Sequence, residues 1–97
     1  MIVRDDLPRG AQSAQLVHAA GESSPGNLSA GTYAIVLSVE NERALVHLAD
    51  RLRVAGVKFV SVFEPDPPYL GAMMAIGLVP ARKEVVGKHL SQLRLLR

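Results

Sequence analysis

Short apolar runs alternate with helical segments along this chain, and that alternation constrains the fold more than any other feature. Strands joined through helices usually run parallel and are connected by right-handed crossovers. The third and fourth apolar runs have no helix between them, so they should pair antiparallel or flank a functional loop. The predicted order is β-α-β-α-β-β-α. The predicted strands are Met1–Arg4, Tyr33–Leu37, Val57–Phe63 and Ala72–Leu78, and Leu93–Leu96 is a final strand or a packed tail.

Three segments between these runs have helical patterns. The first, Ala11–Gly21, is rich in Ala and Gln and has no residue that breaks a helix. The second begins at Ser38–Asn41 and ends before Gly56, which suits a C-terminal cap. The third extends from Pro80, which fits a first helical turn, to about Leu90. The second is the clearest, because its apolar residues share one helix face: Leu45, Leu48, Ala49 and Leu52.

The size and composition of the chain predict a single α/β domain over residues 1–97. Only four residues are aromatic, so the core must consist mainly of Leu, Val, Ile and Ala, which suits a sheet covered by helices. The chain has no cysteine, which excludes disulfides, thiolate metal sites and cysteine nucleophiles. No apolar stretch approaches the roughly 20 residues of a membrane span, and the start is unlike a signal peptide. We therefore expect a cytoplasmic protein without a membrane partner.

The first candidate site is on the predicted helix Ala11–Gly21. Ala11, Gln15 and His18 follow each other at helical spacing and share one face. Gln15 and His18 could together hold a carbonyl, a water molecule or a ribose hydroxyl, and His18 could act as an acid or base near neutral pH. The alternative is that His18 packs against the sheet with a single backbone partner.

The second candidate site is the acidic segment Glu64-Pro65-Asp66, directly after a predicted strand. Ligands of open α/β sheets bind outside the carboxyl ends of the strands. Two carboxylates held there among prolines could orient or activate a water molecule. The alternative is a rigid acidic surface turn.

Other signatures of catalysis are missing. The chain has no glycine-rich phosphate loop, no serine in an elbow motif and no paired histidines at metal-ligand spacing, so we expect no metal site. Cations are concentrated toward the C-terminus, where Arg82–Arg97 contains five of them and one acid, Glu84. Arg4 and Arg9 add two near the N-terminus. Such clusters attract phosphate, although an ordinary solvated helix face has the same composition.

Taken together, these segments resemble the type 2 peptidyl-tRNA hydrolases, in particular their short bacterial members. The resemblance covers almost the whole chain in the right order, and the Ala-Gln-x-x-His-Ala core is its most specific piece. The matching segments are Ile2-Val-Arg-Asp-Asp6-Leu-Pro, Gly10-Ala-Gln-Ser-Ala-Gln15-Leu-Val-His18-Ala-Ala, Phe63-Glu-Pro-Asp66, Ala75-Ile-Gly with Pro80, and Leu90-Ser-Gln-Leu.

The resemblance implies a three-layer α/β sandwich with a mixed four-stranded sheet and helices on both faces. It also implies hydrolysis, without a cofactor, of the ester that joins a peptide to the 3′ ribose of tRNA. Asp66 would then orient or deprotonate the water, and Gln15 and His18 would position the ester or the terminal adenosine. Asp6 would hold the opening turn.

Two positions depart from the archaeal and eukaryotic pattern. Ala11 replaces a lysine, and the region of Met74 lacks a threonine. A lost donor of this kind typically lowers the rate on the order of a hundredfold. Gln12, Arg4 and Arg9 are the candidates to replace these donors in binding substrate, and Glu64 is a further candidate for substrate binding.

Three functions remain open at this point. The chain could hydrolyse peptidyl-tRNA, could be a degenerate relative that binds RNA or a protein without catalysis, or could hydrolyse another ester or amide, since fold does not determine function. The expected partner is the acceptor end of tRNA. A domain of this size can also form a homodimer.

Overall fold

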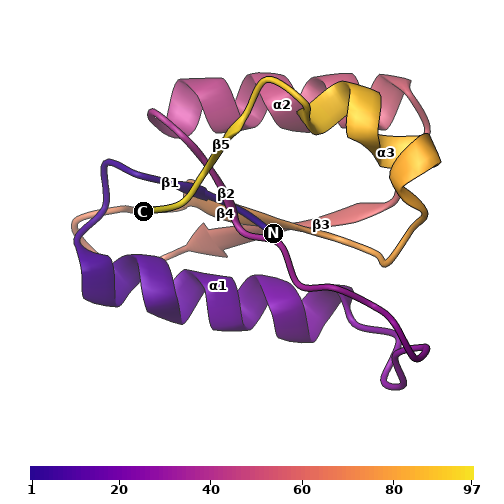
Figure 1. Cartoon of the computed structure of the whole chain (residues 1–97). Coiled ribbons are helices and arrows are strands. Elements are labelled where there is room, and N and C mark those ends of the chain that lie inside the picture. The colour runs from indigo at the N-terminus through magenta and orange to yellow at the C-terminus, as the bar shows by residue number, and fades with distance from the viewer.

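The computed structural model describes all 97 residues and contains three helices and five strands (Figure 1). The predicted order of elements is confirmed, and a short fifth strand follows the last helix. The elements are β1 (Ile2–Arg4), α1 (Arg9–Ser23), β2 (Leu37–Val39), α2 (Glu42–Val54), β3 (Phe59–Glu64), β4 (Ala72–Leu78), α3 (Lys83–Leu90) and β5 (Arg94–Leu95).

The strands form one mixed, open sheet in the order β3-β4-β1-β2-β5. β1 and β2 are parallel and are connected through α1, whereas β4 is antiparallel to both β1 and β3. The antiparallel pairing of β3 and β4 is one of the two arrangements expected for strands with no helix between them. The sheet has five strands rather than the expected four, because Arg94 and Leu95 pair with Ser38 and Leu37 at the edge of β2.

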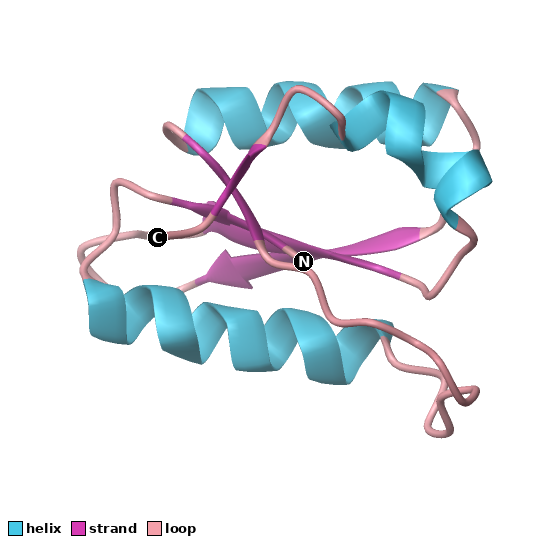
Figure 2. Ribbon diagram, viewed as in Figure 1, coloured by secondary structure: helices cyan, strands magenta, loops and turns pink.

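Helices lie on both sides of the sheet, with α1 on one side and α2 and α3 on the other (Figure 2). Alternate residues of β1 face the two sides: Ile2 belongs to the core cluster under α2, and Val3 to the cluster under α1. Leu90 at the end of α3 packs against the α2 cluster. The four apolar residues predicted for the inner face of α2 are all buried: Leu45, Leu48, Ala49 and Leu52.

A β-bulge in β4 changes which face its residues occupy. Val62 pairs with Ala75 and Phe63 pairs with Met73, so Met74 is the extra residue. Met73 consequently faces the α2 cluster, while Met74 and Ala75 both face the α1 cluster. The bulge fills the space beneath α1 with two consecutive side chains.

α1 is longer than predicted at both ends. It begins at Arg9 because Pro8, with its restricted φ, forms the N-cap and its carbonyl accepts a hydrogen bond from the Gln12 N–H at 2.9 Å. It continues past Gly21 because Ser23 is buried against the sheet. A Cβ atom on Gly77 of β4 would lie 2.3 Å from the Ala19 carbonyl oxygen, so the helix rests directly on the strand backbone there.

The predicted strand Tyr33–Leu37 is wrong except for its last residue. β2 begins at Leu37, and Tyr33 is 85% exposed. A strand needs a partner, and β1 begins only at Ile2, so the pairing on that side ends where Met1 bonds to Ile35 and Leu37. The β-branched and aliphatic residues before Leu37 therefore lie in an exposed loop.

The ends of α2 follow local capping chemistry. Ser38 belongs to β2 rather than to a helix start, and Asn41 is the N-cap, accepting a hydrogen bond from the Ala44 N–H at 3.0 Å. The helix ends before Gly56, whose φ of +75° is in the left-handed region that glycine adopts readily. The predicted C-terminal end is confirmed.

Pro80 does not start the last helix, which begins at Lys83. The Val79 N–H still donates to the Lys58 carbonyl at 3.1 Å, so the chain remains extended just before Pro80. β3 is also shifted from its predicted range: it begins at Phe59 and includes Glu64.

Candidate functional site

The two predicted site segments lie at one end of the sheet, where β1 ends and where β3 turns into β4 (Figure 1). The N-terminal end of α1 and the start of α2 lie at the same end. The carboxyl ends of the parallel strands β1 and β2 lie at this end of the sheet, and ligands of α/β sheets bind outside the carboxyl ends of the strands. The two candidate segments therefore lie where α/β folds commonly bind their ligands.

Gln15 and Glu64 connect the two segments. Gln15 is only 7% exposed, and its Nε2 lies 3.5 Å from Glu64 Oε1, which is long for a hydrogen bond. Glu64 is the last residue of β3 and is half-buried. Its other carboxylate oxygen lies 3.5 Å from the Asp66 backbone N–H. The helix motif and the acidic segment are therefore neighbours in space, with Glu64 rather than Asp66 in contact with Gln15.

Asp66 is exposed in the turn between β3 and β4. Its carbonyl accepts hydrogen bonds from the N–H groups of Tyr69 at 3.0 Å and Leu70 at 3.2 Å, and these bonds close the turn. The Glu64 carbonyl accepts a further bond from the Gly71 N–H at 2.7 Å. The carboxylate of Asp66 makes no hydrogen bond or ion pair within the chain, so it is available to a water molecule or ligand.

His18 is exposed on α1, one turn beyond Gln15. It does not pack against the sheet, and no hydrogen bond joins it to the acidic segment. Only Gln15 of the helix motif makes direct contact with Glu64. Arg9, the first residue of α1, is also exposed and forms no ion pair, which leaves its charge free at this end of the sheet.

The side chain of Arg4 makes its hydrogen bonds within the protein. Its side chain is 12% exposed and forms two bonds to the Asp6 carboxylate, at 2.9 and 3.0 Å, and one to the Met73 carbonyl at 3.2 Å. The hydrogen bond to Asp6 raises the pKa of the Arg4 guanidinium above its ordinary value, and burial opposes part of that effect. Asp6 thus holds the opening turn, and the Arg4 guanidinium already makes three hydrogen bonds within the chain.

The side chain of Gln12 also makes a hydrogen bond within the protein. It is buried, and its Nε2 donates to the Leu7 carbonyl at 3.0 Å. This bond ties the first turn of α1 to the segment after β1. The two candidates for substrate binding that are nearest the core, Arg4 and Gln12, therefore both stabilise the opening turn.

Glu42 was not predicted, although it has a central position at this end of the sheet. Its carboxylate accepts a hydrogen bond from the Met73 N–H at 2.7 Å, and its charge contributes to the raised pKa of Arg4. Side chains of Glu42 and Arg4 thus satisfy both backbone groups of Met73, next to the bulge. The only sequence signal was an acid directly after the N-cap Asn41, which is common at helix starts.

Positions 11 and 74, where the sequence departs from the hydrolase pattern that it resembles, have apolar side chains. Met74 is completely buried in the cluster under α1, and Ala11 packs against the same cluster. Neither position presents a polar group to the candidate site.

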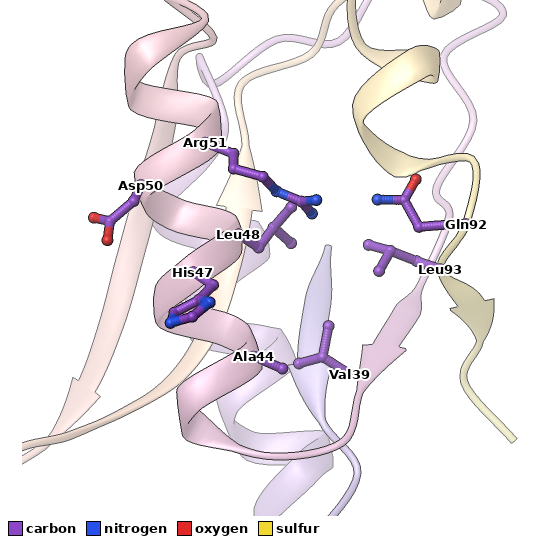
Figure 3. A pocket seen from close by; sticks show the side chains of 8 residues that line it. All are labelled: Val39, Ala44, His47, Leu48, Asp50, Arg51, Gln92 and Leu93. Carbon is purple, nitrogen blue, oxygen red and sulfur yellow. The ribbon is translucent and has the colours of Figure 1, made fainter.

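A groove of about 560 Å³ lies elsewhere, between α2 and the segment before β5. Figure 3 shows Arg51 and Gln92 pointing toward each other across it, with Asp50 pointing away. Its lining contains no residue of the two predicted site segments.

No three His, Cys, Asp or Glu side chains of the chain are close enough to hold a metal ion. Among the helices, none combines the length and the apolar character that crossing a membrane requires. No protein-family model matches the chain, and none of the curated proteins matches it at a significant level.

Proposed function

We propose that this protein hydrolyses the ester between a peptide, or an N-blocked amino acid, and tRNA in the cytoplasm. The observation that carries the proposal is the contact between Gln15 and Glu64. It brings together the two segments on which the resemblance to type 2 peptidyl-tRNA hydrolases depends. The α/β fold with a mixed sheet is compatible with that family, and the detailed three-layer arrangement is part of the proposal.

In the proposed reaction, Asp66 accepts a proton from a water molecule as the water attacks the ester carbonyl. The carbon–oxygen bond to the ribose then breaks, and the proton passes to the 3′ oxygen, which leaves as a free hydroxyl. Support comes from the exposed carboxylate of Asp66, which has no partner within the chain. Glu64 positions the turn by accepting from the Asp66 N–H.

Substrate binding is assigned to the neighbouring helix. Gln15 and His18 would contact the ester or the terminal adenosine, and the exposed Arg9 would contact backbone phosphate. Exposed cations in the C-terminal part of the chain could extend the electrostatic attraction to RNA. Those that form no ion pair are Arg82, Lys83, Lys88, Arg94 and Arg97.

One specific observation favours a second function, tRNA binding without hydrolysis. Two of the residues near the site that could replace the missing lysine and threonine already make hydrogen bonds within the chain. Arg4 binds Asp6 and Met73, and Gln12 binds Leu7. A site with so few free donors fits a degenerate relative that binds tRNA without hydrolysing it.

The test is hydrolysis of an N-acetyl-aminoacyl-tRNA by the purified protein. The proposal expects turnover by the natural chain and a loss of about a hundredfold or more in kcat for Asp66→Asn, the usual scale for a lost general base. Asp50→Asn is the matched control, because Asp50 is an exposed acid of α2. It should retain full activity.

The outcomes separate the two functions. A folded protein that binds tRNA in a salt-sensitive manner without turnover contradicts hydrolysis and supports the binding function. Hydrolysis that is unchanged in Asp66→Asn contradicts the role of Asp66. A folded protein with neither turnover nor tRNA binding at low salt contradicts both functions.

A further inference from the structure

β3 forms one edge of the sheet, with β4 on one side and no strand on the other. The Val79 N–H donates to the Lys58 carbonyl, so the backbone of Lys58 is directed toward the β4 side of the ladder. Because backbone direction alternates along a strand, Val60 and Val62 also point toward β4. The N–H and C=O groups of Phe59, Ser61 and Phe63 therefore point away from the sheet and are free to pair.

The sequence of this edge is symmetric. Lys58-Phe-Val-Ser-Val-Phe-Glu64 reads the same in both directions about Ser61, except at its ends, where a lysine stands opposite a glutamate. An antiparallel strand paired with a copy of itself about Ser61 places each residue opposite its counterpart. The two ends of the segment then bring opposite charges together, and no like charges are opposed.

The faces of the strand are consistent with this pairing. Val62 belongs to the core cluster under α1, and Glu64 contacts Gln15 of α1, so the even-numbered residues face α1. Phe59 packs against the cluster under α2, so the odd-numbered residues face the other side. Paired residues in a two-fold antiparallel arrangement share a face, which keeps aromatic residues with aromatic ones and charged residues with charged ones.

We propose that β3 is the interface of a homodimer in which two copies pair antiparallel about Ser61 and form one continuous ten-stranded sheet. Phe59 of each copy would lie opposite Phe63 of the second copy, and Ser61 opposite Ser61. The ladder would contain six backbone hydrogen bonds, two for each of these three pairs of outward-facing residues. A second copy fits this edge because the edge is complementary to itself.

Exposure at the edge supports the pairing. Phe63 is 54% exposed, and large aromatic residues on an unprotected strand edge promote pairing with another chain. Lys58, an exposed cation, forms no ion pair within its own chain, and Glu64 forms none either. Dimerisation would give both charges a partner. It would also bring Lys58 of the second copy beside the carboxylate that Gln15 contacts, at the proposed site.

The first experiment measures mass by sedimentation velocity over a range of protein concentrations. The natural chain should be a dimer that dissociates on dilution. Ser61→Pro removes the outward N–H without removing a donor to β4, because proline is tolerated at strand edges whose N–H faces solvent. It should weaken dimerisation about tenfold or more through the two lost central hydrogen bonds.

Charge exchange provides a second variant that does not alter the backbone. Lys58→Glu places a glutamate opposite Glu64 of the second copy and should weaken the dimer. The double variant Lys58→Glu/Glu64→Lys restores opposite charges in the same register and should recover it. Recovery by the double variant is not expected from any interface in which these two residues are not opposed.

Cross-linking tests the register directly, because the chain has no cysteine of its own. The two Cα atoms of a hydrogen-bonded antiparallel pair lie about 5.5 Å apart, within the range of disulfides. Ser61→Cys should form a covalent dimer on mild oxidation at protein concentrations where Ser29→Cys, in an exposed loop, remains monomeric. The proposal is overturned if the natural chain is monomeric at all concentrations, or if Ser61→Cys cross-links no faster than Ser29→Cys. Either result leaves the hydrolysis proposal untouched.

Discussion

The buried amide of Gln15 lies 3.5 Å from the carboxylate of Glu64 and joins α1 to the end of β3 across 49 residues of sequence. The two side chains have different surroundings: Gln15 is enclosed by the sheet and helix, whereas Glu64 is half-buried at the rim. A neutral amide is compatible with the neighbouring Glu64 carboxylate, because the amide N–H group of Gln15 is directed at the negative charge. The contact therefore sets which residue types can occupy position 15.

Gln15→Glu should lower the free energy of unfolding by about 1–3 kcal/mol at neutral pH, because it places two carboxylates in contact. Their repulsion raises the pKa of one carboxyl group in the folded state above its value in the unfolded chain. The folded state then binds the extra proton more readily, so the destabilisation is present above that pKa and disappears as the pH falls through it. Urea denaturation at neutral and acidic pH measures both parts of this prediction.

Gln15→Met is the control for side-chain volume, since it removes the amide without adding charge. It should cost less than about 1 kcal/mol, in line with the loss of one weak hydrogen bond, and its effect should not vary with pH. Equal pH dependence in the two variants would mean that Gln15 and Glu64 do not interact.

Gly77→Ala should destabilise the protein by about 1–3 kcal/mol through overpacking. The added methyl group would lie 2.3 Å from the Ala19 carbonyl oxygen, which is helix backbone and cannot move easily, and 2.8 Å from the Ser23 hydroxyl oxygen. Gly21→Ala in α1 is the matched control, because a Cβ atom there meets nothing within 4 Å. That variant should gain roughly 0.5 kcal/mol from a stiffer unfolded chain. Thermal unfolding of both variants tests whether α1 rests on β4 as described.

Arg9→Gln should weaken tRNA binding and reduce the slope of log affinity against log salt by about one, as expected for one lost phosphate contact. Arg53→Gln is the control for charge, because Arg53 already pairs with Asp50 at 2.8 Å and lies over the ring of Phe59. Filter binding over a series of salt concentrations gives both slopes. If the two variants change the slope equally, the binding surface is not at the start of α1.

The elements that the sequence predicted best are those with local causes. The apolar face of α2 follows from the spacing of Leu45 and Leu48, and its end follows from the left-handed conformation of Gly56. The order of strands and helices followed from the same kind of pattern. In the candidate site, Gln15 and the acidic segment were predicted, and they do lie together.

Tyr33 and Glu42 differ from the sequence-based expectation because their surroundings depend on distant segments, whereas Arg4 and Gln12 also bond to residues only two and five positions away, Asp6 and Leu7. Tyr33 has a residue type favoured in strands, yet it is exposed because no strand lies beside it. Arg4 and Gln12 were candidates for substrate binding, but Asp6, Met73 and Leu7 accept their hydrogen bonds. Glu42 was missed because its partner is a backbone N–H 31 residues away.

The sequence by itself determined the helical periodicity, the capping signals and the α/β class of this protein, because each depends on residues within a few positions of one another. The tertiary structure alone decided that Arg94 and Leu95 join the sheet, that a bulge at Met74 turns two side chains toward α1, and that Glu64 contacts Gln15. These outcomes depend on strand register and strand order, which arise only when segments far apart in the chain compete for the same hydrogen bonds and the same buried space.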